Sequence, residues 1–182
     1  AAAAETFRAL LADVPQYPGA DNAQYQLAWC HKLLGDETQA TKAFEELAKA
    51  YPKSSRVPEA EYHIADAAYA GKDYRKAAPL YYTSLQKAGR SPLAEKAGHK
   101  LAWCYYHQGD YERAKQTFHF QQANYPDGPL AADAAFMEAE CLFKQDKFAE
   151  ALAAYEKLGK LSSPDFQALA LLHAGQAAGQ LK

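Results

Sequence analysis

β-branched apolar residues are nearly missing from this sequence. Valine and isoleucine together occur three times in 182 residues, against 40 alanines and 19 leucines. Because strands are built largely from β-branched and aromatic residues, this composition excludes a β-rich fold and favours helices. Hydrophobic residues still make up 49% of the chain and charged residues 23%, so there is enough apolar material for a packed core.

An excess of either charge is missing as well. The chain carries 20 basic and 22 acidic residues, for a formal net charge of −2. Proteins that bind nucleic acid use a basic excess to neutralise phosphates, so nucleic acid is excluded as the expected partner. No apolar run approaches the roughly 20 residues that a membrane-spanning helix needs, so we expect no membrane span.

Motifs for catalysis or metal binding are also missing. The sequence has no nucleophile elbow, P-loop or dinucleotide-binding glycine pattern, and no two of its six histidines lie four residues apart. A contact between His63 and His99, on neighbouring predicted helices, is the arrangement closest to a metal site. Serines 54, 55, 91, 162 and 163 fall in predicted turns. We therefore predict no catalytic residue, no metal and no cofactor, and we expect that the protein is not an enzyme.

The three cysteines lack the spacing of a zinc site. Cys30, Cys104 and Cys141 are separated by 74 and 37 residues, and no Cys-x-x-Cys pair occurs. Equivalent positions in neighbouring repeats lie about 9–10 Å apart, which is too far for a disulfide. We predict that these residues are small buried hydrophobes.

What the sequence does contain is a repeat of 37 residues. Alanine recurs at this spacing, another alanine precedes each by twelve residues, and an aromatic residue follows four residues later. The three series are Ala40, Ala77, Ala114 and Ala151; Ala28, Ala65, Ala102 and Ala139; and Phe44, Tyr81, Phe118 and Tyr155. A fixed period of this length is the signature of stacked supersecondary units.

Each repeat is predicted to form two helices. The first helix runs toward Gly35, Gly71 or Gly109, where glycine supplies a left-handed stop and the aspartate that follows caps the next helix. The second helix ends at Tyr51-Pro52, Gly89 or Tyr125-Pro126. Pro79 conflicts with this pattern, because it falls inside a second helix. We expect a kink there, or a late helix start near Ala78.

These residues resemble the tetratricopeptide repeat (TPR) family. Its pattern of a small residue in the first helix, aromatic–alanine–aromatic in the second and a final proline is matched by Ala102, Tyr105, Tyr111, Ala114, Phe118 and Pro126. The period is three residues longer than the usual 34. The early tryptophan of the first helix is replaced by Gln24, Glu61, Gly98 and Ala135. The resemblance implies an all-α fold, a right-handed α-solenoid of stacked antiparallel helix pairs with about ten helices.

The repeat frame also predicts how residues 1–182 are organised as a single solenoid. Residues 1–17 form a lone second helix, the ranges 18–54, 55–91, 92–128 and 129–163 are full repeats, and residues 164–182 form a lone first helix. We expect a segment of a longer protein. The long turns, with Tyr-Pro-Asp-Gly and Tyr-Pro-Lys-Ser, are similar to bacterial envelope TPR proteins of the Tol–Pal and outer-membrane-assembly type. That similarity favours the periplasm or cell envelope, with the cytoplasm as the alternative.

The resemblance further implies a concave groove, lined by the first helices, that binds other proteins. The predicted groove residues are Tyr25, Trp29, Tyr62, His63, Asp66, Tyr69, His99, Lys100, Trp103, Tyr106, His107, Phe136, Glu140 and Phe143. Exposed tryptophan and tyrosine dominate binding hot spots, but the same rings could instead pack as core. Because the charges at these positions cancel, we expect a partner segment of mixed or apolar character. The alternative is a structural spacer or self-assembling scaffold that uses its ends or its convex face.

Overall fold

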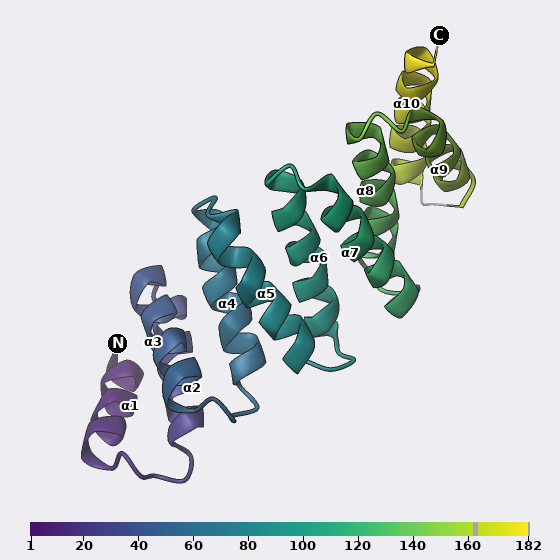
Figure 1. Cartoon of the computed structure of the whole chain (residues 1–182). Helices are drawn as coiled ribbons and strands as arrows, with labels where there is room; N and C mark the ends of the chain where they lie inside the picture. Colours follow the sequence, from purple (N-terminus) through teal and green to yellow (C-terminus); the bar gives the residue numbers. More distant parts are fainter. Residues whose placement is uncertain (162–163, 182) are drawn as a thin grey trace. The chain divides into compact units, whose positions relative to one another are not determined.

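Helices are the regular secondary structure of the described residues, and turns connect them. The computed structural model describes residues 1–161 and 164–181, which form ten α-helices and no strand (Figure 1). Ser162, Ser163 and the predicted repeat boundary at residue 163 lie outside the described residues. The helices are α1 (Ala2–Asp13), α2 (Ala20–Leu33), α3 (Glu37–Ala50), α4 (Val57–Ala70), α5 (Tyr74–Lys87), α6 (Pro92–His107), α7 (Tyr111–Asn124), α8 (Ala131–Lys144), α9 (Phe148–Leu161) and α10 (Pro164–Gln180).

Aspartates begin three of the second helices, as predicted. The side chains of Asp36, Asp73 and Asp110 each accept a hydrogen bond from the backbone N–H three residues later, at 3.0, 3.0 and 3.1 Å. These bonds satisfy one of the amides that the first turn of a helix leaves without a partner. The helix that follows each aspartate is α3, α5 or α7.

The left-handed stop was predicted at the wrong residue in the second repeat. Gly35 and Gly109 have φ of 75° and 76°, as expected, but Gly71 has φ −75°. There the left-handed residue is Lys72, with φ 60°. Gly71 lies one position too early, since Lys72 stands 37 residues after Gly35. A lysine at this angle is strained because its Cβ approaches the backbone.

The predicted late helix start near Ala78 is wrong. Helix α5 begins at Tyr74 and continues through Pro79 without interruption. Asp73 caps the helix, and Pro79 lies in its second turn, on an exposed face. The carbonyl that proline leaves without its usual N–H partner belongs to exposed Arg75, where water can replace the lost bond.

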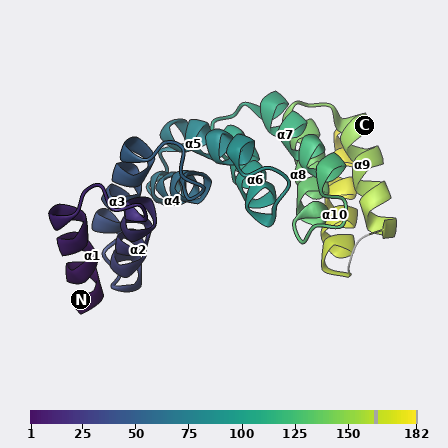
Figure 2. The ribbon, with the colours of Figure 1, turned by 90° about the horizontal axis from the view of Figure 1, so that it is seen from below.

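The chain divides into two compact units, residues 1–94 and 95–182. In unit 1, α1 packs on α2, and α3 packs on both α2 and α4. Seen from below, α2 and α4 lie in one layer of this unit and α3 and α5 in the other (Figure 2). The repeated alanines and aromatics make its core: Ala28, Ala40, Ala65, Ala77, Phe44 and Tyr81 are all at most 1% exposed.

Unit 2 is built in the same way. Helix α8 packs on both α7 and α9, and α10 packs on α9 and α8. The equivalent core residues are Ala102, Ala114, Ala139, Ala151, Phe118 and Tyr155, each 0% exposed. Alanine lets two helices approach closely, and the large ring fills the space between one helix pair and the next. No described helix is long and apolar enough to cross a membrane.

Candidate partner-binding surface

The predicted groove residues of unit 1 fall into two ring clusters. In the first, His63 stacks on Phe44 at 5.0 Å between ring centroids, and Trp29 meets the edge of His63 at the same distance. Tyr25 meets Trp29 at 6.2 Å. Tyr25 is buried, whereas Trp29 and His63 are half-buried. Burial lowers the pKa of His63, and the nearby Lys32 lowers it further.

The second cluster surrounds a carboxylate. The hydroxyl of fully buried Tyr81 donates to Asp66 Oδ1 at 2.5 Å. The ring of Tyr81 also lies 5.5 Å from Tyr62 and 6.3 Å from Tyr69. Burial and the charge of Asp66 raise the pKa of Tyr62 to about 12. Asp66 therefore joins α4 to α5 through this hydrogen bond. The hydroxyl of Tyr62 stays protonated and neutral at physiological pH.

In unit 2, the predicted groove residues gather around Trp103. Its ring lies 5.6 Å from Tyr106, 5.5 Å from His107 and 6.2 Å from the buried ring of Phe118. His107 is exposed, while Trp103 and Tyr106 are half-buried. Lys100, on the same helix, is also half-buried. The Trp103 ring thus packs against the core ring of Phe118 and is only half-buried, as amphipathic rings at binding hot spots often are.

His99 ties this cluster to two other helices. Its Nδ1 lies 2.9 Å from Gln121 Oε1 on α7, and its Nε2 lies 3.0 Å from Asp133 Oδ2 on α8. The indole N–H of Trp103 points at the same Nε2, at 3.1 Å. His99 is 8% exposed, so it is a core residue of unit 2.

The remaining predicted residues lie on α8. Phe136 is 7% exposed and packs within 5.7 Å of Tyr155 and 5.2 Å of His173. Glu140 Oε1 accepts hydrogen bonds from the Tyr155 hydroxyl and from His173 Nδ1. Half-buried Phe143 meets Phe148 at 5.2 Å. Phe136 and Glu140 are therefore engaged inside unit 2.

The same first-helix position alternates between tryptophan and a carboxylate along the repeats, so that each residue type recurs after 74 residues. Trp29 and Trp103 each lie near a phenylalanine of the second helix, at 6.4 and 6.2 Å. Asp66 and Glu140 stand at the same repeat position, and each instead accepts a hydrogen bond from the hydroxyl of a second-helix tyrosine. Sequence reasoning missed this pairing and the role of His173. The Phe–Tyr–Phe–Tyr order along the repeats is the signal that could have revealed the pairing.

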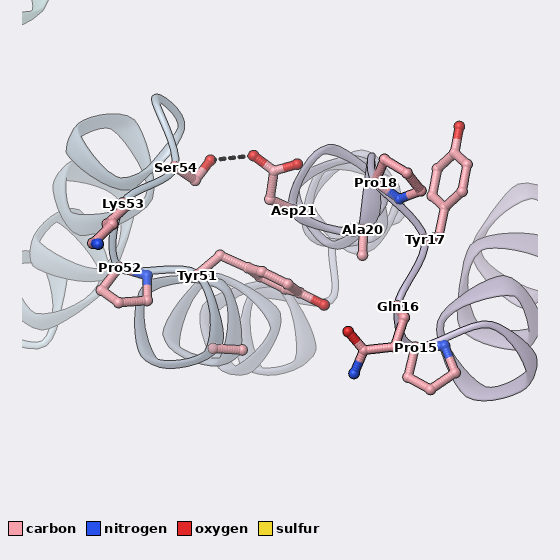
Figure 3. Close-up of a pocket in the computed structure, with 11 residues that line it drawn as sticks. Pro15, Gln16, Tyr17, Pro18, Ala20, Asp21, Tyr51, Pro52, Lys53 and Ser54 are labelled. Carbon is pink, nitrogen blue, oxygen red and sulfur yellow. Dashed lines mark hydrogen bonds between the residues drawn. The ribbon is translucent and has the colours of Figure 1, made fainter.

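Several hollows open in unit 1. One, of about 490 Å³, lies between the loop that precedes α2 and the loop that follows α3 (Figure 3). Tyr17, Pro18, Tyr51 and Pro52 line it, and the Ser54 hydroxyl donates to Asp21 at 2.6 Å at its edge. The second, of about 860 Å³, lies between α3 and α4 and includes the predicted groove residue Asp66 in its wall.

The described residues contain no group of three or more histidine, cysteine or carboxylate side chains placed to hold a metal ion. Cys104 and Cys141 are fully buried, which confirms their predicted role as core residues, but Cys30 is half-buried. Burial and the charge of Glu140 raise the pKa of the Cys141 thiol to about 12, so it stays a protonated hydrophobe.

Comparisons with known proteins agree with the repeat geometry. A model of the tetratricopeptide repeat matches residues 22–54. A model of the anaphase-promoting complex, cyclosome, subunit 3 matches residues 74–158. The chain is a tetratricopeptide repeat protein. This fold is typical of protein–protein interaction modules. No curated protein sequence matches the chain.

Several solved structures share the fold at low identity. The apo form of RapI aligns with 13% identity and a TM-score of 0.69, over 86% of this chain and 61% of RapI. The TPR-like repeats of a Podosopora anserina kinesin light chain protein align with 15% identity and a TM-score of 0.66, over 91% and 88%. BtubC from P. vanneervenii aligns with 16% identity and a TM-score of 0.69, over 98% and 81%. The chain thus spans 61% of the length of RapI.

Proposed function

We propose that this TPR protein is a non-catalytic interaction module that binds a partner segment of mixed or apolar character along its first helices. The support comes from the cluster of Trp103, Tyr106 and His107. The Trp103 ring packs against the buried ring of Phe118 and against the other two rings, and all three residues remain partly accessible. Rings that are already immobilised lose little entropy when a partner covers them. Trp29 and Tyr62 offer similar half-buried rings in unit 1.

The test is binding by variants that keep the fold. Trp103→Ala and Tyr106→Ala are compared with Phe120→Ala, which removes an exposed ring from a second helix. A partner is captured on the full chain from an extract of the source organism, and its affinity for each variant is then measured. Truncation of a hot spot weakens binding by about 30-fold or more, equivalent to about 2 kcal/mol. Equal affinity of all variants, with circular dichroism unchanged, would assign these rings to packing alone.

A self-assembling scaffold is the second candidate. One observation favours it: Leu171 and Leu172 on α10 are each 59% exposed. Exposed leucines on one helix favour association with a further apolar surface. If copies of the chain associate there, the mass measured by sedimentation rises with concentration, and Leu171→Glu with Leu172→Glu abolishes the rise. A constant monomer mass would remove this candidate. The envelope location stays a prediction.

A further inference from the structure

A third hollow of unit 1, of about 350 Å³, is lined by residues of α1, α2 and α3. Its buried polar lining comes from Gln24 and His31 of α2, which are 7% and 8% exposed. These two residues lie seven positions apart, so they share one face of the helix. Arg8 of α1 and Lys42 of α3 also line the hollow, and both are exposed. A cavity of this volume with a few convergent polar groups is typical of a small-ligand site.

The two cations of this hollow have no acidic partner. In the part of the chain that the structure describes, neither Arg8 nor Lys42 forms an ion pair, although Glu46 lines the same hollow. Glu46 is engaged elsewhere, because its Oε2 accepts a hydrogen bond from Gln24 Nε2 at 3.0 Å. Lys42 also borders the hollow between α3 and α4. Two cations and one engaged carboxylate leave this hollow with an excess of positive charge, which attracts an anion.

The repeat register shows that Arg8 is unusual in having no acidic partner. Glu45 stands 37 residues after Arg8, and it pairs with Lys76 at 3.9 Å. His119 stands 111 residues after Arg8, and its Nδ1 lies 3.2 Å from Glu138 Oε1. In both places the fold supplies the group of opposite character from a neighbouring helix. The donors of Arg8 therefore remain for a ligand.

We propose that this hollow binds a phosphate group. Arg8 supplies the planar fork of donors that matches phosphate oxygens, and its Nη2 also lies 3.5 Å from His31 Nε2. Lys42 and Gln39 add an ammonium and an amide from α3. Three separate donor groups suit the several oxygens of a phosphate better than the two of a carboxylate. None of the lining residues belongs to the predicted groove, so this inference goes beyond the proposed function.

The experiment is a titration of the full chain with inorganic phosphate at constant ionic strength. Binding is followed by the NMR signals of the Arg8 side-chain Nε–H and the His31 ring, and saturable shifts are expected at both. Sodium acetate and sodium chloride are titrated in the same way. Phosphate is expected to bind about tenfold more tightly than acetate, because it engages at least one more charge-assisted hydrogen bond. Equal affinities would overturn the assignment to phosphate, and shifts that do not saturate or that chloride reproduces would overturn the site.

Matched variants separate a defined site from a general charge effect. Arg8→Gln and Lys42→Gln each remove one cation of the hollow, and both are expected to fold because the residues are exposed. Arg75→Gln and Lys49→Gln are the controls, since they remove exposed cations of unit 1 that do not line the hollow. R8Q and K42Q should each weaken phosphate binding by about tenfold or more, and the controls by less than about twofold. An equal loss in the controls would overturn the site.

A second probe, N-acetyl-phosphoserine-N-methylamide, distinguishes the two sources of a phosphate group. Binding that is tighter than that of inorganic phosphate, and that is lost in R8Q, would support a phosphorylated protein as the ligand. Weaker binding, with inorganic phosphate still saturating the site, would support free phosphate.

Discussion

The pairing of a second-helix tyrosine with a first-helix carboxylate predicts an energetic coupling in unit 1. Tyr81 is 0% exposed, and its hydroxyl donates to Asp66 at 2.5 Å. A hydrogen bond to a charged group contributes about 1.5–3 kcal/mol. Because Asp66 remains partly exposed, water can replace the hydroxyl in part, so we expect the lower end of this range. Tyr81→Phe should therefore cost about 1.5 kcal/mol of unfolding free energy.

The assay is a double-mutant cycle in urea, followed by circular dichroism. Tyr81→Phe, Asp66→Asn and the double variant are compared at constant m-value, and a coupling of about 1 kcal/mol is expected. Tyr82→Phe is the matched control, since its ring is 52% exposed on the same helix and should change stability by less than about 0.5 kcal/mol. The reasoning is refuted if Y81F is no more destabilising than Y82F, or if the coupling is near zero.

Three further predictions concern the left-handed stop, a buried imidazole and the close alanine contacts. Lys72→Gly should stabilise the protein by about 1 kcal/mol, and Gly109→Ala should destabilise it by a similar amount. The reason is that these residues have φ of 60° and 76°, which only glycine adopts without strain. Thermal unfolding that shows the opposite signs would contradict this prediction. Burial keeps the pKa of His63 in the folded protein below its ordinary value of 6.5. The neutral ring therefore contributes its full stability above pH ~6.5, and this stability falls as the pH drops toward the pKa of the folded state. His63→Gln should make this fall smaller, as measured by urea midpoints between pH ~5 and ~7.5. Ala102→Leu should cost about 1–3 kcal/mol by overpacking, since Ala102 is 0% exposed, and a neutral result in chemical unfolding would show that the helices can separate.

Capping shows how far local sequence rules reach in this chain. The aspartate caps at Asp36, Asp73 and Asp110 follow from side-chain chemistry within four residues, and the structure has all three. The same rules misplaced the stop at Gly71, because they assume that the glycine itself takes the left-handed angle. They also delayed the start of α5, because the cost of Pro79 depends on whether water reaches the carbonyl four residues earlier.

The candidate surface depended on contacts that a single repeat does not contain. The spacing placed Trp29, Tyr62 and Trp103 at the first-helix positions used for binding in the resembled family. How far each ring is buried depends on side chains of other helices, which the spacing does not give. His99 proved to be core because α7 and α8 supply Gln121 and Asp133. The assignment of Glu140 depended on His173, which is 33 residues distant and outside the regular repeat register.

The sequence by itself determined the helical class, the 37-residue period and the positions of the core alanines, because periodicity and side-chain size act through local geometry. Only the tertiary structure decided which rings are covered, which carboxylates are engaged and where a hollow remains. The hollow beside Asp66 exists because Thr38 and Thr41 on one helix face Ala67 and Ala70 on another. Each residue is ordinary in its own helix, and an open space arises when four short side chains meet across two packed helices.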